Sequence, residues 1–278
     1  MRAADLQSLP RVQAAMVFTR PGADKPVAES RGPRGEVHYP KGVYEERTVT
    51  IESLRPRRAD YTLDRHGFML ADHRTAVVDF RDDDELRAVY YPEAERLVAA
   101  LTGAARVVIF DHTRRTADEA AQRRDNLREP VRVVHNDYTD WSGPQRVRDV
   151  LPDEAAALLA CRVAVVQVWR SMRGPVVQQP LALCDARSIA PADLIAAERR
   201  HPNRVGEIYQ IAYSPAQRWY YAPALGFGEA LVFKTYDSAT DGRARFSAHG
   251  SFLDPAAPAD APPRESIEVR AFAFFGAT

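Results

Sequence analysis

The sequence predicts a mainly β protein with flanking helices, built as an antiparallel barrel or a double-sheet jelly roll. Two observations lead to this fold class. Short runs rich in β-branched and aromatic residues dominate the second half of the chain, and turn signals such as Asp241-Gly242 separate them in a way that suits antiparallel pairing. No glycine-rich phosphate loop follows any of these runs, which disfavours a doubly wound fold. The predicted strands are residues 106–110, 131–137, 162–169, 207–213, 230–236, 244–252 and 266–275.

The remaining segments predict helices and an extended N-terminal region. Residues 1–60 are rich in Arg, Pro and Gly, so we expect extended segments that wrap the core and cover a site. Residues 83–102 carry apolar side chains at three- and four-residue spacing, and Gly103 ends this helical pattern. Shorter helices are predicted at residues 118–127, 153–159 and 191–200. We expect one domain over residues 1–278, with the helices and the jelly-roll core in residues 61–278.

The composition limits the classes of function. Lys plus Arg and Asp plus Glu each number 38 in the 278 residues, and a neutral chain has no global field that favours nucleic acid or an anionic membrane. No apolar run approaches the roughly 18 residues of a membrane span, and the first 30 residues lack the apolar centre of a signal peptide. Cys161 and Cys184 are too few for a disulfide framework, and we expect two buried free thiols. These features predict a soluble cytoplasmic protein and leave the oligomeric state open, a homo-oligomer included.

One histidine-containing motif has the spacing of a metal site. Among seven histidines only His135 is followed two residues later by an acid, Asp137, and residues i and i+2 of a strand share a face about 7 Å apart. The pattern alone arises often by chance, and a surface His-Asp pair at a strand end explains it equally well. Val131 and Val133 precede the motif on the same strand face, which favours burial. His249, near the end of a distant predicted strand, would complete the facial triad of a non-heme iron(II) oxygenase.

The last predicted strand carries candidates for a carboxylate-bearing cosubstrate. Arg264 follows the proline-rich loop 255–263, where its guanidinium could pair in bidentate fashion with the distal carboxylate of 2-oxoglutarate. Ser266 shares its strand face, and Arg270 has the same parity and competes for the role. The alternative for Arg264 is a solvated side chain after the loop.

Further candidates lie on other predicted strands. Gln167 and Trp169 share one face of a strand and could bind the cosubstrate, and Arg170 ends that strand. Aromatic residues are enriched in strands, so core packing is the more frequent role for any one of them. The remaining candidates for substrate contact are Tyr209, Trp219 and Tyr220.

A series of short motifs from about residue 60 onward resembles the gibberellin desaturase and AsaB-like family. The motifs are RHGF (65–68), VYYPE (89–93), IFDHT (109–113), HNDY (135–138), SGPQRV (142–147), VWR (168–170), LALCD (181–185), VGEIY (205–209), RWYY (218–221), YDS (236–238), DGRARF (241–246) and PPRESIEVR (262–270). Two departures stand out. Ser171 replaces a proline after the Trp-Arg pair, and Ala248-His249-Gly250 replaces Pro-His-Thr around the distal histidine.

The resemblance implies both a fold and a chemistry. Members of this family are described as hydroxylases or desaturases of natural products, related to iron(II)/2-oxoglutarate oxygenases, and one is named as a subunit in cephamycin 7-methoxylation. The resemblance therefore implies a double-stranded β-helix core of the jelly-roll, cupin-like type. It also implies metal ligands at His135, Asp137 and His249, with Arg264 for 2-oxoglutarate. We expect an oxygenase that takes a small-molecule substrate and dioxygen, with no nucleic-acid or membrane partner.

Two other functions are compatible with the same residues. The first is a metal-dependent isomerase or lyase on this fold that does not use 2-oxoglutarate, and it predicts no succinate production. The second is a non-catalytic subunit that delivers substrate to another biosynthetic enzyme, and it predicts a missing ligand or weak metal affinity. Neither the substrate nor the choice between hydroxylation and desaturation follows from the sequence.

Overall fold

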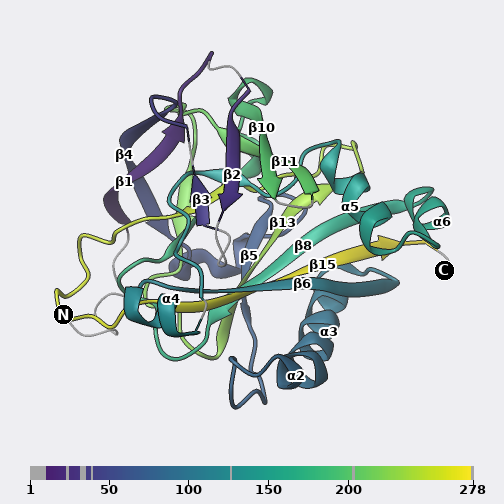
Figure 1. Ribbon diagram of the computed structural model, residues 1–278, viewed down its shortest axis with the longest axis horizontal. Helices are drawn as coiled ribbons and strands as arrows, with labels where there is room; N and C mark the ends of the chain where they lie inside the picture. The colour runs from purple at the N-terminus through teal and green to yellow at the C-terminus, as the bar shows by residue number, and fades with distance from the viewer. Residues whose placement is uncertain are drawn as a thin grey trace.

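Two β-sheets with helices on the outside make up the computed structural model of the protein, which describes residues 11–22, 25–31, 36–38, 40–125, 127–201 and 204–276 (Figure 1). The smaller sheet has five antiparallel strands, in the order β5 (Phe68–Asp72), β13 (Glu229–Asp237), β8 (Arg162–Ser171), β15 (Glu265–Phe275) and β6 (Arg106–Thr116). All of its strands alternate in direction, as the turn signals in the sequence predict.

The larger sheet has ten described strands and curls back on itself. Its order is β1 (Arg11–Thr19), β4 (Tyr44–Ser53), β12 (Trp219–Tyr221), β9 (Leu181–Cys184), β14 (His249–Ser251), β7 (His135–Asn136), β11 (Arg204–Ile211), β10 (Leu194–His201), β2 (Val27–Arg31) and β3 (Glu36–His38). The curl brings β1 beside the strand that holds the predicted metal ligands. The amide of Val134 donates to the carbonyl of Val17 at 2.8 Å, and Val17 and Val133 form a parallel bridge.

The helices cover one face of the smaller sheet and its ends. Helix α2 (Asp83–Glu85), the π-helical turn η2 (Leu86–Tyr90) and α3 (Tyr91–Thr102) form a continuous segment below the sheet in Figure 1. Asp82 caps its start with hydrogen bonds to two backbone amides, and Gly103 ends it in the left-handed conformation, at φ 71°. The shorter helices are α4 (Glu119–Asp125), α5 (Ser142–Val150) and α6 (Ala155–Leu159), with 3-10 turns at Arg55–Asp60, Ala186–Ser188 and Pro191–Asp193.

The period-two alternation of the smaller sheet separates two apolar cores. On β8, Val166 and Val168 point toward α3, where they pack with Tyr90 and Val98 in the outer core. Trp169 points the other way, into the space between the sheets, where the second core includes Leu231 and Phe233 of β13 with Leu181 and Leu183 of β9. A third core, containing Phe18, Trp219 and Phe252, fills the curl of the larger sheet. The double-sheet jelly roll predicted from the sequence is therefore the observed fold.

Several predicted elements differ from those observed. The helix predicted at residues 191–200 is wrong, because only a 3-10 turn forms there before Leu194–His201 pairs along its full length with β11. Tertiary pairing overrides the helical propensity of Ala196 and Ala197. Helix α5 was not predicted. The expected extended N-terminal segments are present, but as ordered strands of the larger sheet, and residues 1–10 lie outside the described residues.

Two further expectations concern the burial of the two cysteines and the presence of membrane-spanning helices. Cys184 is buried as expected, whereas Cys161 is exposed in the short turn between α6 and β8. Both are free thiols. In the part of the chain that the structure describes, no helix has the length and apolar character needed to cross a membrane.

Candidate metal centre and cosubstrate site

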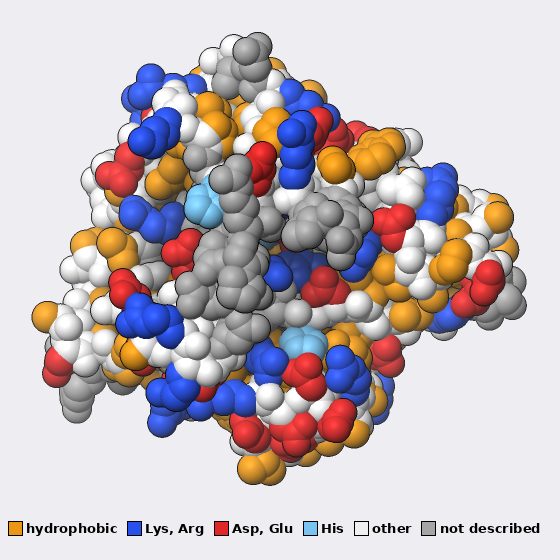
Figure 2. All heavy atoms as spheres, viewed as in Figure 1, with side chains coloured by type: hydrophobic (Ala, Val, Ile, Leu, Met, Phe, Trp, Pro, Cys, Tyr) orange, Lys and Arg blue, Asp and Glu red, His pale blue; other side chains and the backbone are white. Residues whose placement is uncertain are grey.

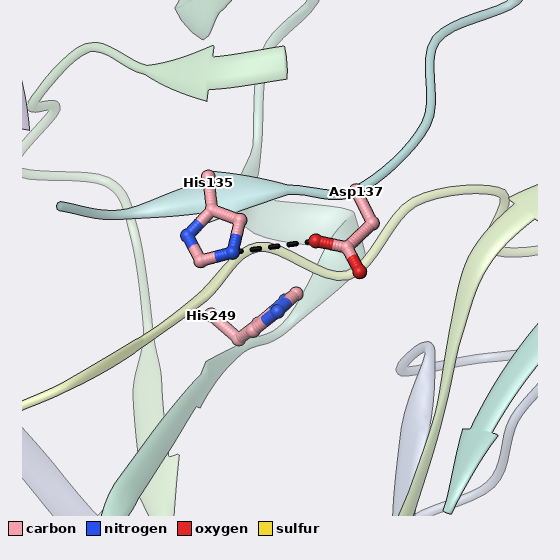
Figure 3. Close-up of side chains that lie close together, drawn as sticks. All are labelled: His135, Asp137 and His249. Atoms are coloured by element: carbon pink, nitrogen blue, oxygen red, sulfur yellow. Dashed lines mark ion pairs between the residues drawn. The ribbon is translucent and has the colours of Figure 1, made fainter. Parts of the chain in front are cut away.

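Neighbouring strands bring the three predicted metal ligands together (Figure 3). His135 on β7 lies directly opposite His249 on β14 in an antiparallel pair, and the ring centroids are 4.5 Å apart. Asp137 follows two residues after His135, and its Oδ1 lies 3.3 Å from His135 Nε2. One potential ligand atom from each of the three residues lies within 4.8 Å of the others. Cross-strand pairing and the period of the strand thus produce a compact His-Asp-His group.

Both histidines present the nitrogen needed to bind a metal. The Nδ1 of His135 lies 2.8 Å from the carbonyl oxygen of Val133, and that of His249 lies 3.1 Å from the carbonyl oxygen of Ser247. A carbonyl oxygen only accepts hydrogen bonds, so each Nδ1 carries the proton and each Nε2 keeps a free lone pair. Burial is the main cause that lowers the pKa of His249, to about 4, so this ring is neutral at ordinary pH.

The carboxylate of Asp137 has one oxygen held by the protein and one directed toward His135. Its Oδ2 accepts from Gln167 Nε2 at 2.7 Å and from Arg270 Nε at 2.8 Å. Burial alone would raise the pKa of Asp137, but the charge of Arg270 and the neighbouring histidines outweigh it and hold the pKa well below its ordinary value. Asp137 is therefore ionised and oriented through Oδ2, with Oδ1 available to a cation.

Protein partners occupy every donor nitrogen of Arg270. Besides Asp137, it donates to Asp111 Oδ1 at 3.2 Å, to Thr113 Oγ1 at 3.1 Å and to the buried carboxylate of Glu268. Burial would lower its pKa, but the charges of Glu268 and Asp137 raise it above its ordinary value. These contacts orient Asp137 and use all but one of the N–H groups of Arg270.

Arg264 is buried and, unlike Arg270, has few protein partners. It is 3% exposed, its Nε donates to Ser266 Oγ at 3.0 Å, its Nη1 donates to the carbonyl of Gln179 at 2.9 Å, and its guanidinium lies 5.0 Å from the ring centroid of Trp169. Within the described residues it forms no ion pair with an Asp or Glu side chain. Burial, together with the charge of Arg115, lowers the pKa of Arg264 to about 9. A buried guanidinium without a counter-ion is an unusual feature that a carboxylate ligand would neutralise.

Asn136, which the sequence analysis did not select, ties the ligand strands to their neighbours. Its side chain is fully buried, and its Nδ2 donates to the carbonyls of Tyr138 at 2.7 Å and Thr235 at 2.9 Å. Its Oδ1 accepts from the backbone amide of Ser247 at 3.1 Å, two residues before His249. One amide thus fixes both ligand-bearing segments relative to β13. Its place between two ligands, facing the opposite side of the strand, is the signal that could have identified it.

A cavity of about 810 Å³ opens onto the metal group. His135, Asp137 and Arg270 form part of its wall, together with residues of β6, α5, β10 and β11. Glu268, another residue missed from sequence, lies beside this wall on the same face of β15 as Arg264 and Arg270, where it holds Arg115 at 3.2 Å. Their shared parity was visible in the sequence.

The structure brings only some of the weaker candidates to this region. Gln167 and Trp169 face the space between the sheets, with Gln167 engaged by Asp137. Arg170 points to the opposite face of β8, where its guanidinium lies 4.9 Å from the ring centroid of Phe227 and 5.3 Å from that of Phe80. Three further candidates, none of which lines the cavity, are placed elsewhere: Tyr209 beside Asp140 and Phe246, Trp219 in the core of the curl, and Tyr220 against Tyr61 and Phe68.

Comparison with known proteins agrees with this site. The family described as "Oxidoreductase/YMDC permease-like domain" matches residues 16–274. The Fe(II)/2-oxoglutarate-dependent dioxygenase nvfI of Aspergillus novofumigatus is 34% identical over 236 residues, which cover 82% of this chain and 83% of that protein. The hydroxylase/desaturase CTB9 of Cercospora beticola is 33% identical over 263 residues, 87% of this chain and 80% of its own length.

A solved structure shows the same architecture. The iron and alpha-ketoglutarate-dependent endoperoxidase NvfI superimposes with a TM-score of 0.84 at 28% identity, covering 96% of this chain and 99% of that chain. The jelly-roll fold, the enzyme class, and iron(II) with 2-oxoglutarate as the cofactors are thereby confirmed. The chain belongs to the family of Fe(II)/2-oxoglutarate-dependent dioxygenases and hydroxylase/desaturases.

Proposed function

We propose that His135, Asp137 and His249 hold the iron. The observation that carries this assignment is the convergence of two unprotonated Nε2 atoms and one carboxylate oxygen, each on a side chain whose other polar atom is fixed by a hydrogen bond. The donor set is the two-histidine, one-carboxylate group that suits iron(II). Gln167 Oε1 is buried without a hydrogen-bond donor in the described part of the chain, which fits a site that is completed by a bound ligand or water.

We further propose that Arg264 and Ser266 bind the distal carboxylate of 2-oxoglutarate. Arg264 is buried and pairs with no Asp or Glu among the described residues, whereas three carboxylates surround Arg270, and this supports Arg264 over Arg270 as the residue for 2-oxoglutarate. Its stacking on Trp169 and its bond to Ser266 Oγ hold the guanidinium in one orientation. Trp169 is thus assigned to the cosubstrate pocket, and Gln167 to orientation of Asp137.

The reaction that we propose is hydroxylation or desaturation of a small natural product at a C–H bond presented in the cavity. Iron(II) with 2-oxoglutarate and dioxygen supplies the oxidising power when bound. The chain's own residues orient the ligand carboxylate through Gln167 and Arg270, hold the Nδ1–H of both histidines on backbone carbonyls, and shape the cavity beside them. The hydroxylase/desaturase names of the relatives support this reaction class.

The balanced charge supports a protein without a nucleic-acid partner, and we propose the cytoplasm as its location. The N-terminal strands β1 to β4 belong to the larger sheet and the C-terminal β15 lies inside the smaller one, which supports a single oxygenase domain over residues 1–278. A homo-oligomer is compatible with these features.

Succinate formation tests the proposed function. Anaerobically purified wild type, His135→Ala and the exposed-histidine control His38→Ala are supplied with iron(II), 2-oxoglutarate and oxygen. Slow substrate-free turnover, and the weak visible charge-transfer band of the iron–keto-acid complex before oxygen is added, are expected in wild type and His38→Ala and lost in His135→Ala. The absence of both signals from the wild type would overturn the proposal.

A further inference from the structure

The cavity beside the metal group has a basic wall. Its lining contains seven arginines and four acidic residues, although the protein as a whole is neutral. In Figure 2, basic side chains (blue) lie in the hollow near the centre of the visible face, beside acidic ones (red). Because a substrate must occupy this cavity to reach the metal, the excess of positive charge bears on what it binds.

Acidic neighbours already neutralise five of the seven arginines. Arg270 pairs with Asp137 and Glu268, and Arg115 with Glu268. The other three also lie within ion-pair distance of aspartates: Arg114 and Arg87 near Asp83, and Arg146 near Asp111. These five arginines are therefore already paired with acidic groups of the protein.

Arg128 and Arg199 are the exceptions. Neither side chain makes a hydrogen bond or an ion pair with any residue that the structure describes, although both line the cavity. The other acids of the wall are engaged, since Asp149 accepts from Gln145 at 2.8 Å and Glu207 from Lys25 and Thr139. Among the described residues, two guanidinium groups therefore face the cavity without a counter-ion.

The two arginines come from different elements and face a common space. Arg128 follows α4, and its backbone amide donates to the carbonyl of Arg114 on β6 at 3.2 Å. Arg199 lies on β10, opposite Gly206 of β11. Loss of hydration, together with the charges of Arg115, Arg270 and Arg199, lowers the pKa of Arg128, and the charge of Asp111 opposes this shift only in part. Like charges held near one another favour an anion between them.

The segment that joins Arg128 to the metal ligands is apolar on its cavity side. Val131 and Val133 line the cavity between Arg128 and His135. A ligand lying along this wall therefore meets a cation at one end, a hydrophobic surface in the middle and the metal group at the other end.

We propose that Arg128 and Arg199 form a subsite for a carboxylate on the substrate, and that the apolar body of the same molecule lies over Val131 and Val133 toward the metal. This inference rests on the proposed function, because it assigns the substrate class of the same site. The carboxylate fixes which end of the substrate enters and therefore which C–H bond is presented. The cosubstrate carboxylate is bound separately, by Arg264.

A matched pair of probes tests the subsite by calorimetry. The protein is loaded with manganese(II) and saturating 2-oxoglutarate, then titrated with 1-naphthaleneacetate or with the neutral 1-naphthaleneacetamide. Wild type should bind the carboxylate at least about tenfold more tightly, as expected for charge-assisted hydrogen bonds. The variant Arg128→Met/Arg199→Met should bind both probes alike. The control Arg123→Met/Arg200→Met removes the same net charge from exposed positions outside the cavity lining and should keep the preference.

The outcomes separate this inference from the proposed function. Equal binding of the two probes by wild type, binding of neither, a preference that survives in Arg128→Met/Arg199→Met, or an equal loss in the control variant each overturns the subsite. The iron–keto-acid band is recorded on the same proteins loaded with iron(II). Its absence from wild type contradicts the proposed function, whereas its loss only in Arg128→Met/Arg199→Met assigns the two arginines to 2-oxoglutarate and also overturns the inference.

Discussion

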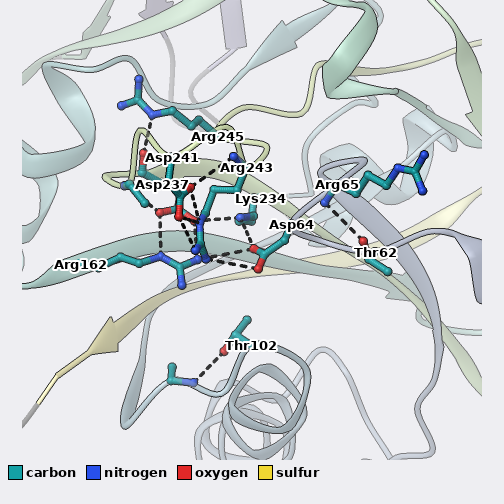
Figure 4. Close-up of polar contacts among 12 residues, drawn as sticks. Thr62, Asp64, Arg65, Thr102, Arg162, Lys234, Asp237, Asp241, Arg243 and Arg245 are labelled. Carbon is teal, nitrogen blue, oxygen red and sulfur yellow. Dashed lines mark hydrogen bonds and ion pairs between the residues drawn. The ribbon is translucent and has the colours of Figure 1, made fainter.

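Two aspartates, the half-buried Asp137 and the fully buried Asp237, are held by cations in different ways. Both carboxylate oxygens of Asp237 are saturated by protein donors (Figure 4): Oδ1 accepts from Arg162 Nε at 3.0 Å and from the amide of Ala239, and Oδ2 accepts from Arg162 Nη2 at 2.7 Å and Lys234 Nζ at 2.8 Å. Asp137 is held through Oδ2 alone, and its Oδ1 faces two unprotonated histidine nitrogens.

This is the difference expected between an aspartate that stabilises the fold and one that binds a metal ion. The Asp237 group closes on itself, since Lys234 also binds Asp64 at 2.8 Å and Arg243 joins Asp64 to Asp241. It ties the loop before β5 to β8 and β13. The Asp137 group is complete on one side only, which is the arrangement expected of a metal ligand with partners that orient it.

The largest effect should come from Asp137→Asn. The amide replaces the anionic ligand oxygen, so iron affinity and succinate formation should fall by more than about 100-fold, since even the outer partners of metal ligands are worth about 10- to 100-fold. Iron binding is measured by equilibrium dialysis, with thermal unfolding as the check on folding. Near-normal iron affinity in Asp137→Asn would contradict the assignment.

Asp237→Asn should lower the stability of the protein and leave its iron affinity unchanged. It leaves Lys234, which is 1% exposed, with a weaker set of partners, and breaking a buried pair costs about 3–5 kcal/mol of the free energy of unfolding. Urea denaturation measures this loss, while the folded fraction should keep wild-type iron affinity. A loss of iron affinity larger than the loss of stability would show that the two groups are coupled.

The loss of stability in Asp237→Asn should also depend on pH. Burial would raise the pKa of Asp237, but hydrogen bonds from Arg162 and Lys234 and the charge of Lys234 bring it below its ordinary value of 3.8. A depressed folded pKa contributes stability that is present above 3.8 and is lost as pH falls through the folded value. The difference in unfolding free energy between wild type and Asp237→Asn should therefore shrink below about pH 4. A constant difference from about pH 6 to about pH 2 would argue against this electrostatic origin.

Arg264→Met should raise the KM for 2-oxoglutarate by about 10- to 100-fold, the value of charge-assisted hydrogen bonds to a carboxylate. Iron affinity should stay unchanged, because Arg264 makes no contact with the three ligands. The matched control is Arg57→Met, which removes an exposed arginine whose partner is Asp60 and which contacts neither Arg264 nor the metal group. A rise in KM for Arg270→Met with none for Arg264→Met would reverse the assignment of the two arginines.

Asn136→Ala gives the smallest expected change, about tenfold weaker iron binding, because it removes the amide that links β7 to Thr235 and Ser247 without touching a ligand. Asn136→Asp is the companion variant, since it keeps the acceptor for Ser247 and loses the donors. Partial recovery of iron affinity in Asn136→Asp supports positioning of the His249 segment, and identical defects in both variants point to the Thr235 contact.

Strand parity explains which parts of the site could be predicted from the sequence. His135, Asp137, Arg264, Ser266 and Arg270 each lie on the expected inner face, because period-two alternation is a local property. The same rule places Arg170 opposite Gln167 and Trp169, away from the site. Parity does not show which partners a side chain reaches. The sequence alone therefore could not distinguish Arg264 from Arg270 as the candidate for 2-oxoglutarate.

Contacts between distant segments could not be predicted in this way. Arg128 and Arg199 are ordinary surface arginines in the sequence, and only the fold places them in one cavity with His135. The strand at Leu194–His201 was predicted as a helix because its pairing with β11 and β2 is a tertiary choice. The two ligand strands are shorter than predicted, and side-chain hydrogen bonds of Asn136, rather than a longer backbone ladder, link the segments beside them.

The place of β15 in the smaller sheet has a consequence for the order of events during synthesis. It lies between β8 and β6, yet it follows every other described strand along the chain. While the ribosome still holds this segment, β6 and β8 have no partner between them and Asp137 lacks Arg270, its neutralising cation. His249 and Arg270 both come late in the described chain, so the metal group can be completed only after nearly all of this region has been synthesised, and we expect selective iron binding to follow that point.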